Sequence, residues 1–264
     1  MSTPELPDSI AGNIADWTRS NEQYTDARAE VAWAPQPITW GVFGVREDEI
    51  GSPLGDVAGL DVVELGCGTA YFSAQMAHRG ARPVGVDPTP AQLATARRMQ
   101  EQMDLHFPLV EAPAERVPLP DASFDLAFSE FGASLWADPI LWIPEAARLL
   151  RPGGRLVFLT NSLLAALCMP DRGPATEQLV RDQRGLRRVS YPDDDGQEFH
   201  LAHGEWIATL ARHGFAVDAL HELYAPEGAS PTRFEWITPE WARRWPIEEI
   251  WIATRLTGGS GPPA

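Results

Sequence analysis

The stretch Val62-Val63-Glu64-Leu65-Gly66-Cys67-Gly68-Thr69-Ala70 decides the fold. A short apolar run ended by glycine is typical of a buried strand, and residues 70–78 that follow have a helical pattern. Glycines at such a junction let the backbone turn sharply and approach a ligand closely. The first amides of the following helix favour an anion. The stretch therefore predicts a strand, a glycine loop and a helix that together bind a ligand with an anionic group.

Outward from this stretch, short apolar strands alternate with helical patterns. Strands are expected at 62–65, 83–87, 107–110, 124–128 and 155–159, with helices at 70–78, 90–103 and 139–150. After Thr160 the alternation breaks, and the sheet pattern returns with a helix at 203–213 and strands at 215–223 and 249–256. Alternation at this spacing predicts an α/β protein with a mainly parallel sheet covered by helices on both faces.

The chain divides into five expected segments. They are an N-terminal helical segment at 1–55, a cofactor-binding core at 56–160, an inserted substrate cap at 161–201, the final helix and strands at 202–257 and a flexible tail at 258–264. The cap is expected to hold a short apolar helix, an arginine-rich helix and the acidic run at 193–195. Such an insertion is typical of a segment that covers a site.

Composition excludes several classes of partner. The 264 residues include 37 acidic and 21 basic side chains, for a formal charge of −16. This balance argues against nucleic acid and against an anionic membrane surface. There is no apolar run of about 20 residues and no secretory signal. The two cysteines, Cys67 and Cys168, match no metal or redox spacing, so we expect no metal site and a cytoplasmic protein with reduced thiols. We expect the protein to be a monomer or a homodimer.

Asp87 defines the kind of ligand more closely. It ends the second strand, where a carboxylate can accept both hydroxyls of a ribose. The glycine loop and the Asp87 carboxylate together imply a ligand that contains a nucleoside. Two classes of cofactor fit this description. A dinucleotide site requires a third glycine, where this chain has Tyr71. The alternative is S-adenosylmethionine, whose anionic group is a small carboxylate.

Four blocks in order extend this argument: Glu64-Leu65-Gly66-Cys67-Gly68-Thr69, Val84-Gly85-Val86-Asp87, the run from Val117 to Asp125, and Leu149-Leu150-Arg151-Pro152-Gly153-Gly154. With these blocks, residues 60–160 resemble the class I S-adenosylmethionine-dependent methyltransferases, in the branch of the ubiquinone and menaquinone biosynthesis enzymes. The resemblance implies a Rossmann-like, doubly wound sheet of seven strands with the last strand antiparallel.

The resemblance also implies roles for individual residues. The loop Gly66-Cys67-Gly68 would hold the methionine end of the cofactor with support from Glu64, and Tyr24 would lie against the same end. The other implied cofactor contacts are Asp87 at the ribose, Pro88, Ala114 and Glu115 at the adenine, and Ser129 facing the methionine moiety. The chain departs from the family at Pro113, where an aspartate is common, so adenine recognition is expected to fall to Glu115.

The chemistry expected from the resemblance is methyl transfer to a small organic molecule, with oxygen favoured over nitrogen, carbon and sulfur. His200 and His203 follow the cap and are candidates for a general base. An apolar substrate pocket is expected from Trp33, Trp40, Phe43, Phe131 and Trp136. Two alternatives stay open: a protein of this fold that binds the cofactor without methylating, and a nicotinamide-dependent oxidoreductase.

Overall fold

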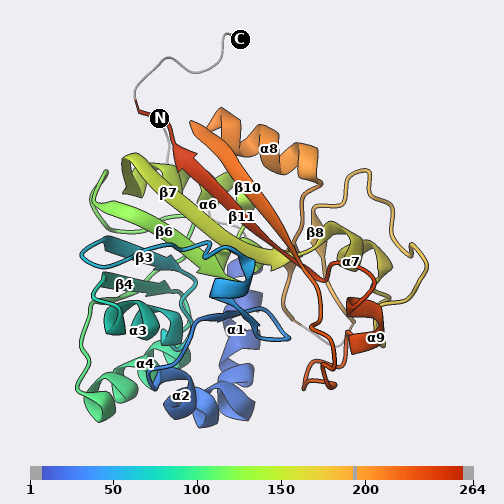
Figure 1. Cartoon of the computed structure of the whole chain (residues 1–264), viewed down its shortest axis with the longest axis horizontal. Helices are drawn as coiled ribbons and strands as arrows, with labels where there is room; N and C mark the ends of the chain where they lie inside the picture. The colour runs from blue at the N-terminus through green and yellow to red at the C-terminus, as the bar shows by residue number, and fades with distance from the viewer. Residues whose placement is uncertain (1–7, 193–194, 258–264) are drawn as a thin grey trace.

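The computed structural model describes residues 8–192 and 195–257 (Figure 1). Among these residues no helix is both long and apolar enough to cross a membrane. The helices are α1 Ser9–Ser20, a π-helical turn Asn21–Thr25, α2 Asp26–Trp33, a 3₁₀ turn Glu47–Ile50, α3 Tyr71–His78, α4 Pro90–Met103, α5 Ala133–Trp136, α6 Pro139–Leu149, α7 Leu163–Cys168, α8 His203–Arg212 and α9 Pro239–Ala242. The strands are β1 Thr39–Trp40, β2 Val45–Arg46, β3 Asp61–Leu65, β4 Arg82–Asp87, β5 Leu109–Glu111, β6 Phe124–Glu130, β7 Leu150–Asn161, β8 Arg188–Val189, β9 Glu198–Phe199, β10 Phe215–Leu223 and β11 Glu248–Arg255.

Seven strands form the central sheet in the order β10-β11-β7-β6-β3-β4-β5. The pairs among β3, β4, β5, β6 and β7 are parallel, and β11 lies antiparallel between β7 and β10. The expected seven-stranded, doubly wound sheet with an antiparallel last strand is thus confirmed. The strand order reverses between β3 and β6, which creates a crevice at their carboxyl ends.

Helices cover both faces of the sheet. Trp142 of α6 and Trp206 of α8 pack on one face against Phe158 of β7. On the other face Phe72 of α3 packs against Phe128 of β6 and under the N-terminal segment. Because both faces are covered, most residues in the middle of the central strands are apolar.

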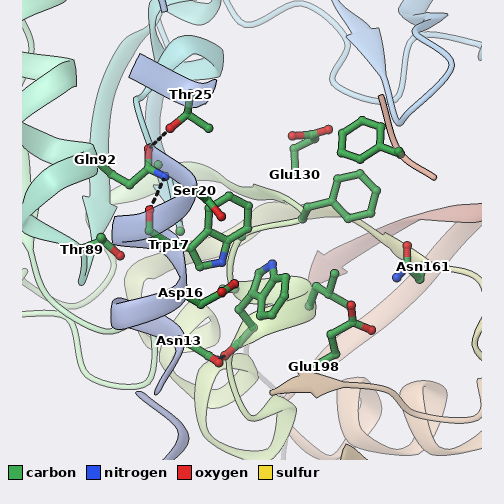
Figure 2. Close-up of a pocket in the computed structure, with 18 of the residues that line it drawn as sticks. Asn13, Asp16, Trp17, Ser20, Thr25, Thr89, Gln92, Glu130, Asn161 and Glu198 are labelled. Carbon is green, nitrogen blue, oxygen red and sulfur yellow. Dashed lines mark hydrogen bonds between the residues drawn. The ribbon is translucent and has the colours of Figure 1, made fainter. Parts of the chain in front are cut away.

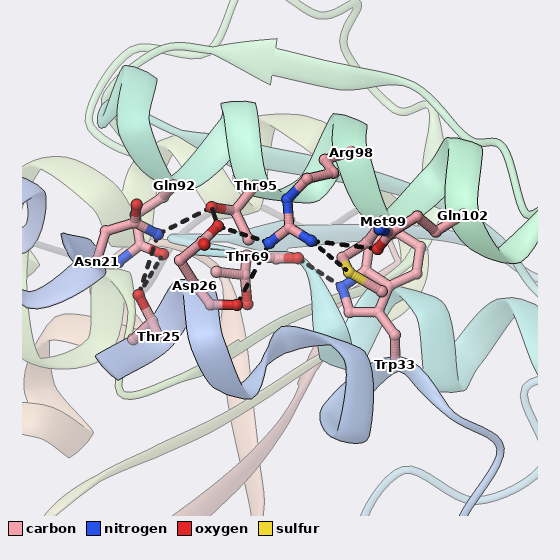
Figure 3. A network of polar contacts seen from close by, with 10 residues as sticks. All are labelled: Asn21, Thr25, Asp26, Trp33, Thr69, Gln92, Thr95, Arg98, Met99 and Gln102. Carbon is pink, nitrogen blue, oxygen red and sulfur yellow. Dashed lines mark hydrogen bonds and ion pairs between the residues drawn. The ribbon is translucent and has the colours of Figure 1, made fainter. Parts of the chain in front are cut away.

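Polar contacts hold the N-terminal helices on α4 (Figure 3). Asn21 is buried and its amide donates to Thr95, while Asp26 forms a 2.6 Å ion pair with Arg98. Gln92 accepts from the Thr25 hydroxyl at 3.4 Å. Each of these bonds joins residues about 70 positions apart, and together they place α1 beside the carboxyl edge of the sheet.

The region 161–201 differs from the expected cap in one element. The short apolar helix is present as α7, but the expected arginine-rich helix is absent, and residues 174–187 form an irregular loop before the β8–β9 hairpin. Gly185 has a φ of +82°, and Leu179 and Val180 are exposed, so this stretch has no apolar face to pack. Short helices depend on such packing. Residues 193–194 of the acidic run and the expected tail at 258–264 lie outside the described residues.

Candidate active site

A cavity of about 1220 Å³ lies at the carboxyl ends of β3, β4, β6 and β7 (Figure 2). One wall is the glycine loop after β3, and the opposite wall is α1. The rest of its lining comes from the turn after β1, the loop after β5, residues 169–173 and 191 of the cap, Glu198 of β9 and the loop 233–236. Ligands of open α/β sheets bind at this place, where the strand order reverses.

The glycine loop is shaped by a close approach of two backbones. Gly66 has a φ of +76°, and a Cβ at this position would lie 2.5 Å from the amide nitrogen of Ala133. A Cβ on Gly132 would lie 2.1 Å from the carbonyl oxygen of Gly66. Only glycine fits at both positions. The contact fixes the loop against the start of α5, and Gly66, Cys67 and Gly68 all line the cavity, as the motif predicts.

Asp87 is buried at the end of β4, yet it lines the cavity. Its two carboxylate oxygens accept the amides of Gly68 and Thr89, each at 2.8 Å. Burial raises the pKa of this carboxyl, and the two amide bonds oppose that rise. Each carboxylate oxygen has a second lone pair, so Asp87 can accept further bonds from a ligand hydroxyl.

Glu64 holds the start of α3. Its carboxylate accepts the amide of Ser73 at 2.9 Å and also the Ser73 hydroxyl. Burial raises the pKa of Glu64 well above its ordinary value. Glu64 also lines the cavity, so it both supports the loop and can meet a cationic group there.

The expected adenine contacts come from the loops after β4 and β5. Pro88, Ala114 and Glu115 all line the cavity. Glu115 accepts the amide of Asp138 at 3.2 Å, and burial raises its pKa. This carboxyl therefore joins the loop after β5 to the first turn of α6.

Ser129 does not line the cavity. It is fully buried at the end of β6, where its hydroxyl donates to the Leu65 carbonyl at 2.7 Å and accepts the amide of Ser134. The expectation that Ser129 faces the methionine moiety is therefore corrected, because β3 and α5 already use its hydrogen bonds.

The expected aromatic pocket is only partly correct. Phe131 and Trp136 line the cavity. Trp33 and Trp40 do not, since both are fully buried in the packing of the N-terminal segment on the sheet. Phe43 packs with α7 and α9 outside the cavity lining. Apolar burial draws these three rings into cores, and sequence spacing does not reveal which way they point.

Neither candidate histidine reaches the cavity. His200 is buried and lies 2.9 Å from Glu198, and His203 lies 2.8 Å from Glu249 at the start of α8. Glu198 lines the cavity but the two histidine rings do not. Their placement therefore does not support the expectation that one of them is the general base.

Sequence reasoning missed two polar residues at the strand ends, Glu130 and Asn161. Glu130 ends β6, lines the cavity and accepts the Tyr71 hydroxyl at 2.7 Å. Burial raises the pKa of Glu130 to about 7, which suits a group that takes a proton near neutral pH. Asn161 ends β7, and its side-chain oxygen is buried with no partner among the described residues. Their position at the ends of parallel strands was the available signal.

Two further cavity residues come from segments far apart in the chain. The guanidinium of Arg233 stacks 4.5 Å from the ring of Tyr24, so the N-terminal segment meets the loop before α9. Both residues line the cavity. Trp17 of α1 lies edge to face with Trp136, with ring centres 5.4 Å apart. These contacts close an aromatic wall opposite the strand ends.

Comparison with known proteins decides the class of this site. The methyltransferase domain family matches residues 63–158, from β3 to β7. The core of this chain is a methyltransferase domain. The resemblance predicted from the four motifs is confirmed, and the glycine loop and Asp87 lie within the matched residues.

Relatives of the methyltransferase domain differ in how much of the chain they cover. The malonyl-[acyl-carrier protein] O-methyltransferase of Serratia marcescens is 37% identical over 121 residues, which are 46% of this chain and 45% of that protein. The chain thus spans about half the length of the curated relatives it matches. The S-adenosylmethionine-dependent methyltransferase of Mesorhizobium loti has a TM-score of 0.63 at 26% identity and covers 81% of this chain and 100% of its own.

A third similarity extends over nearly the whole chain. The [4+2]-cyclase SpnF has a TM-score of 0.63 at 17% identity and covers 97% of this chain and 98% of its own. At this identity the likeness concerns the fold alone. The methyltransferase fold by itself therefore does not decide between methyl transfer and other chemistry.

Proposed function

We propose that this protein is an S-adenosylmethionine-dependent methyltransferase that methylates a small organic molecule, with oxygen as the favoured acceptor. The observation that carries the proposal is the buried Asp87 carboxylate, which faces a cavity at the switch point of a methyltransferase domain. The O-methyltransferase activity of the Serratia relative supports oxygen as the acceptor.

The residues around the cavity suit the chemistry of this cofactor. Asp87 would accept the ribose hydroxyls, and Glu115 would accept from the adenine amino group. Glu64 would meet the ammonium group of the methionine moiety, whose carboxylate would face the loop amides at the start of α3. The cofactor supplies an electrophilic methyl group on a sulfonium, and the protein aligns the acceptor with it and excludes water.

The charge and the cysteines of the chain bear on its partners and its location. A formal charge of −16 supports a small-molecule substrate, with no nucleic acid or anionic membrane as partner. We further propose a cytoplasmic location, because both cysteines are buried and free among the described residues. For the oligomeric state we propose a monomer or homodimer.

A turnover assay tests the proposal against its alternatives. The protein is incubated with S-adenosylmethionine and a set of phenols, carboxylic acids and amines, and S-adenosylhomocysteine is measured together with products heavier by one methylene. The Asp87→Ala variant is the control for the site. Acceptor-dependent formation of both products supports the proposal. Binding of the cofactor with a transformed substrate that gains no methyl group favours the non-methylating alternative.

A further inference from the structure

Glu130 and Asn161 lie on the same face of the sheet at its carboxyl edge. In the sheet register Glu130 is paired with Leu159, which stands two residues before Asn161 on β7. Residues two apart on a strand share a face, and paired residues on neighbouring strands do too. Asn161 is paired in turn with Glu248 of β11. Figure 2 shows Glu130 and Asn161 at the strand-end side of the cavity, with α1 residues across from them.

The Glu130 carboxyl is surrounded by groups from every element packed against it. Tyr71 of α3 donates its hydroxyl to it, and the backbone amide of Gly41 donates from the N-terminal segment. Arg233 faces it with a positive charge, and Glu64 of β3 and Glu248 of β11 lie near enough to be affected by its charge. These contacts hold the side chain in one position and leave it in contact with the cavity.

Asn161 has the opposite character, since its side-chain oxygen accepts no hydrogen bond from the described residues. Only 7% of the residue is exposed, and its Oδ1 atom is buried without a partner among the described residues. Leaving a buried polar atom unpaired destabilises the protein, so such a group calls for an explanation. Asn161 lines the cavity, and a ligand that donates a hydrogen bond there satisfies it.

The remaining walls favour an aromatic ligand. Among the described residues, eight aromatic side chains line the cavity: Trp17, Tyr24, Tyr71, Phe131, Trp136, Tyr191, Phe234 and Trp236. A phenolic hydroxyl has a pKa near 10, so it is protonated at neutral pH and reacts with a methyl donor only when a base removes its proton.

We propose that Glu130 is the general base for a phenolic methyl acceptor, and that Asn161 binds a second hydroxyl on the same ring. This inference rests on the proposed function. The acceptor oxygen gives its proton to the Glu130 carboxylate and forms a bond to the methyl carbon. The bond between that carbon and the donor sulfur breaks, and the sulfonium becomes a neutral thioether. Glu130 then returns the proton to solvent.

The spacing of the two residues selects the probe. Neighbouring strands lie about 4.8 Å apart and residues two apart on a strand about 6.6 Å apart, so the Cα atoms of Glu130 and Asn161 are roughly 8 Å apart. Two hydroxyls placed meta on one ring fit between them, so resorcinol is the test ligand and phenol is its matched control. Both are titrated into the protein in complex with S-adenosylhomocysteine, and binding is followed by the tryptophan fluorescence of the protein, to which Trp17 and Trp136 of the cavity contribute.

Three variants separate the two roles. Resorcinol should bind the wild-type complex about fivefold more tightly than phenol, since one extra hydrogen bond forms. Asn161→Leu should bind the two compounds equally, and its melting temperature should not fall, because it removes an unpaired polar atom. Glu130→Gln should lower the affinity of the complex for both compounds about fivefold. Glu227→Gln, the same change at an exposed position, should leave both affinities unchanged.

Methylation of resorcinol gives a second readout. The wild-type rate should rise with pH to half of its plateau at about pH 7 and level off above that, and Glu130→Gln should lose this rise. In the wild-type protein the hydrogen bond from Tyr71 lowers the pKa of Glu130. Tyr71→Phe removes this bond, so the pKa of Glu130 should increase and the rise in rate should move to higher pH. The inference is overturned if the complex binds neither compound, or if Glu130→Gln and Asn161→Leu leave both affinities unchanged. A protein that does not bind S-adenosylhomocysteine at all contradicts the proposed function instead.

Discussion

The amide of Gly68 donates a 2.8 Å hydrogen bond to the carboxylate of Asp87, and this bond joins the glycine loop to the end of β4. The second carboxylate oxygen of Asp87 accepts the amide of Thr89, before α4. One buried side chain therefore fixes two loops of the cofactor site.

Replacing Asp87 by alanine should weaken binding of S-adenosylmethionine by tenfold or more. The change removes charge-assisted hydrogen bonds worth about 1.5–3 kcal/mol and leaves two amides without their acceptor. Calorimetric titration measures the affinity, and the melting temperature shows that the variant is folded. Unchanged affinity in a folded Asp87→Ala protein rules out the ribose assignment.

Gly132→Ala should destabilise the protein by about 1–3 kcal/mol, because the added methyl group meets the Gly66 carbonyl. Gly204→Ala is the matched control. Gly204 lies in α8 with no atom near its would-be Cβ, so alanine there should stabilise by about 0.5–1 kcal/mol. Urea unfolding measures the free energy of unfolding of both variants. Equal changes in the two variants would show that the backbones of Gly66 and Gly132 leave room for a methyl group.

Trp33 and Trp136 should respond differently to phenylalanine. The indole of Trp33 donates to the Thr69 carbonyl at 2.8 Å, so Trp33→Phe should cost about 1–3 kcal/mol of stability and weaken cofactor binding through the loop. The indole nitrogen of Trp136 has no partner among the described residues, so Trp136→Phe should lower the stability by less than Trp33→Phe does. Chemical unfolding measures both, and a larger loss for Trp136→Phe speaks against this assignment.

His203→Ala should retain turnover at neutral pH. The ring lies beside Glu249 and Trp251 at the start of α8 and not in the cavity lining. Steady-state rates with any accepted substrate test this. A loss of turnover larger than the loss of stability would restore His203 as a candidate base.

Stability should fall as pH rises through 7 and 8. Burial raises the pKa of Glu130 to about 7 and that of Glu248 to about 8. A carboxyl whose pKa is raised on folding stabilises the fold below its unfolded pKa, and this contribution is lost as pH rises through the folded pKa. The free energy of unfolding should therefore be higher at pH 5 than at pH 9.

Glu248→Gln isolates this effect from the general repulsion among acidic groups. Glutamine keeps an oxygen that can accept the Val42 amide but has no charge to bury. Between pH 5 and pH 9 the free energy of unfolding of the variant should fall by less than that of the wild-type protein. Glu227→Gln, at an exposed site, should follow the wild-type slope. If Glu248→Gln follows it too, Glu248 is not held protonated by the fold.

The strand, loop and helix at 61–78 could be predicted because their signals are local. An apolar run, two glycines and a helical pattern stand next to each other, and Asp87 ends the next strand. The cavity lining of the substrate side could not be predicted in the same way. Glu130 and Asn161 are 31 positions apart in the sequence, and only the pairing of β6 with β7 brings them to one face. The burial of Trp33 and the direction of His203 likewise depend on which face of a helix packs.

Calorimetric titration with S-adenosylmethionine is the decisive measurement on this protein. We expect one cofactor per chain for the wild-type protein, an affinity lower by tenfold or more for Asp87→Ala, and no heat with a nicotinamide dinucleotide. Heat from the dinucleotide and none from S-adenosylmethionine would mean that the glycine loop and Asp87 bind a dinucleotide instead.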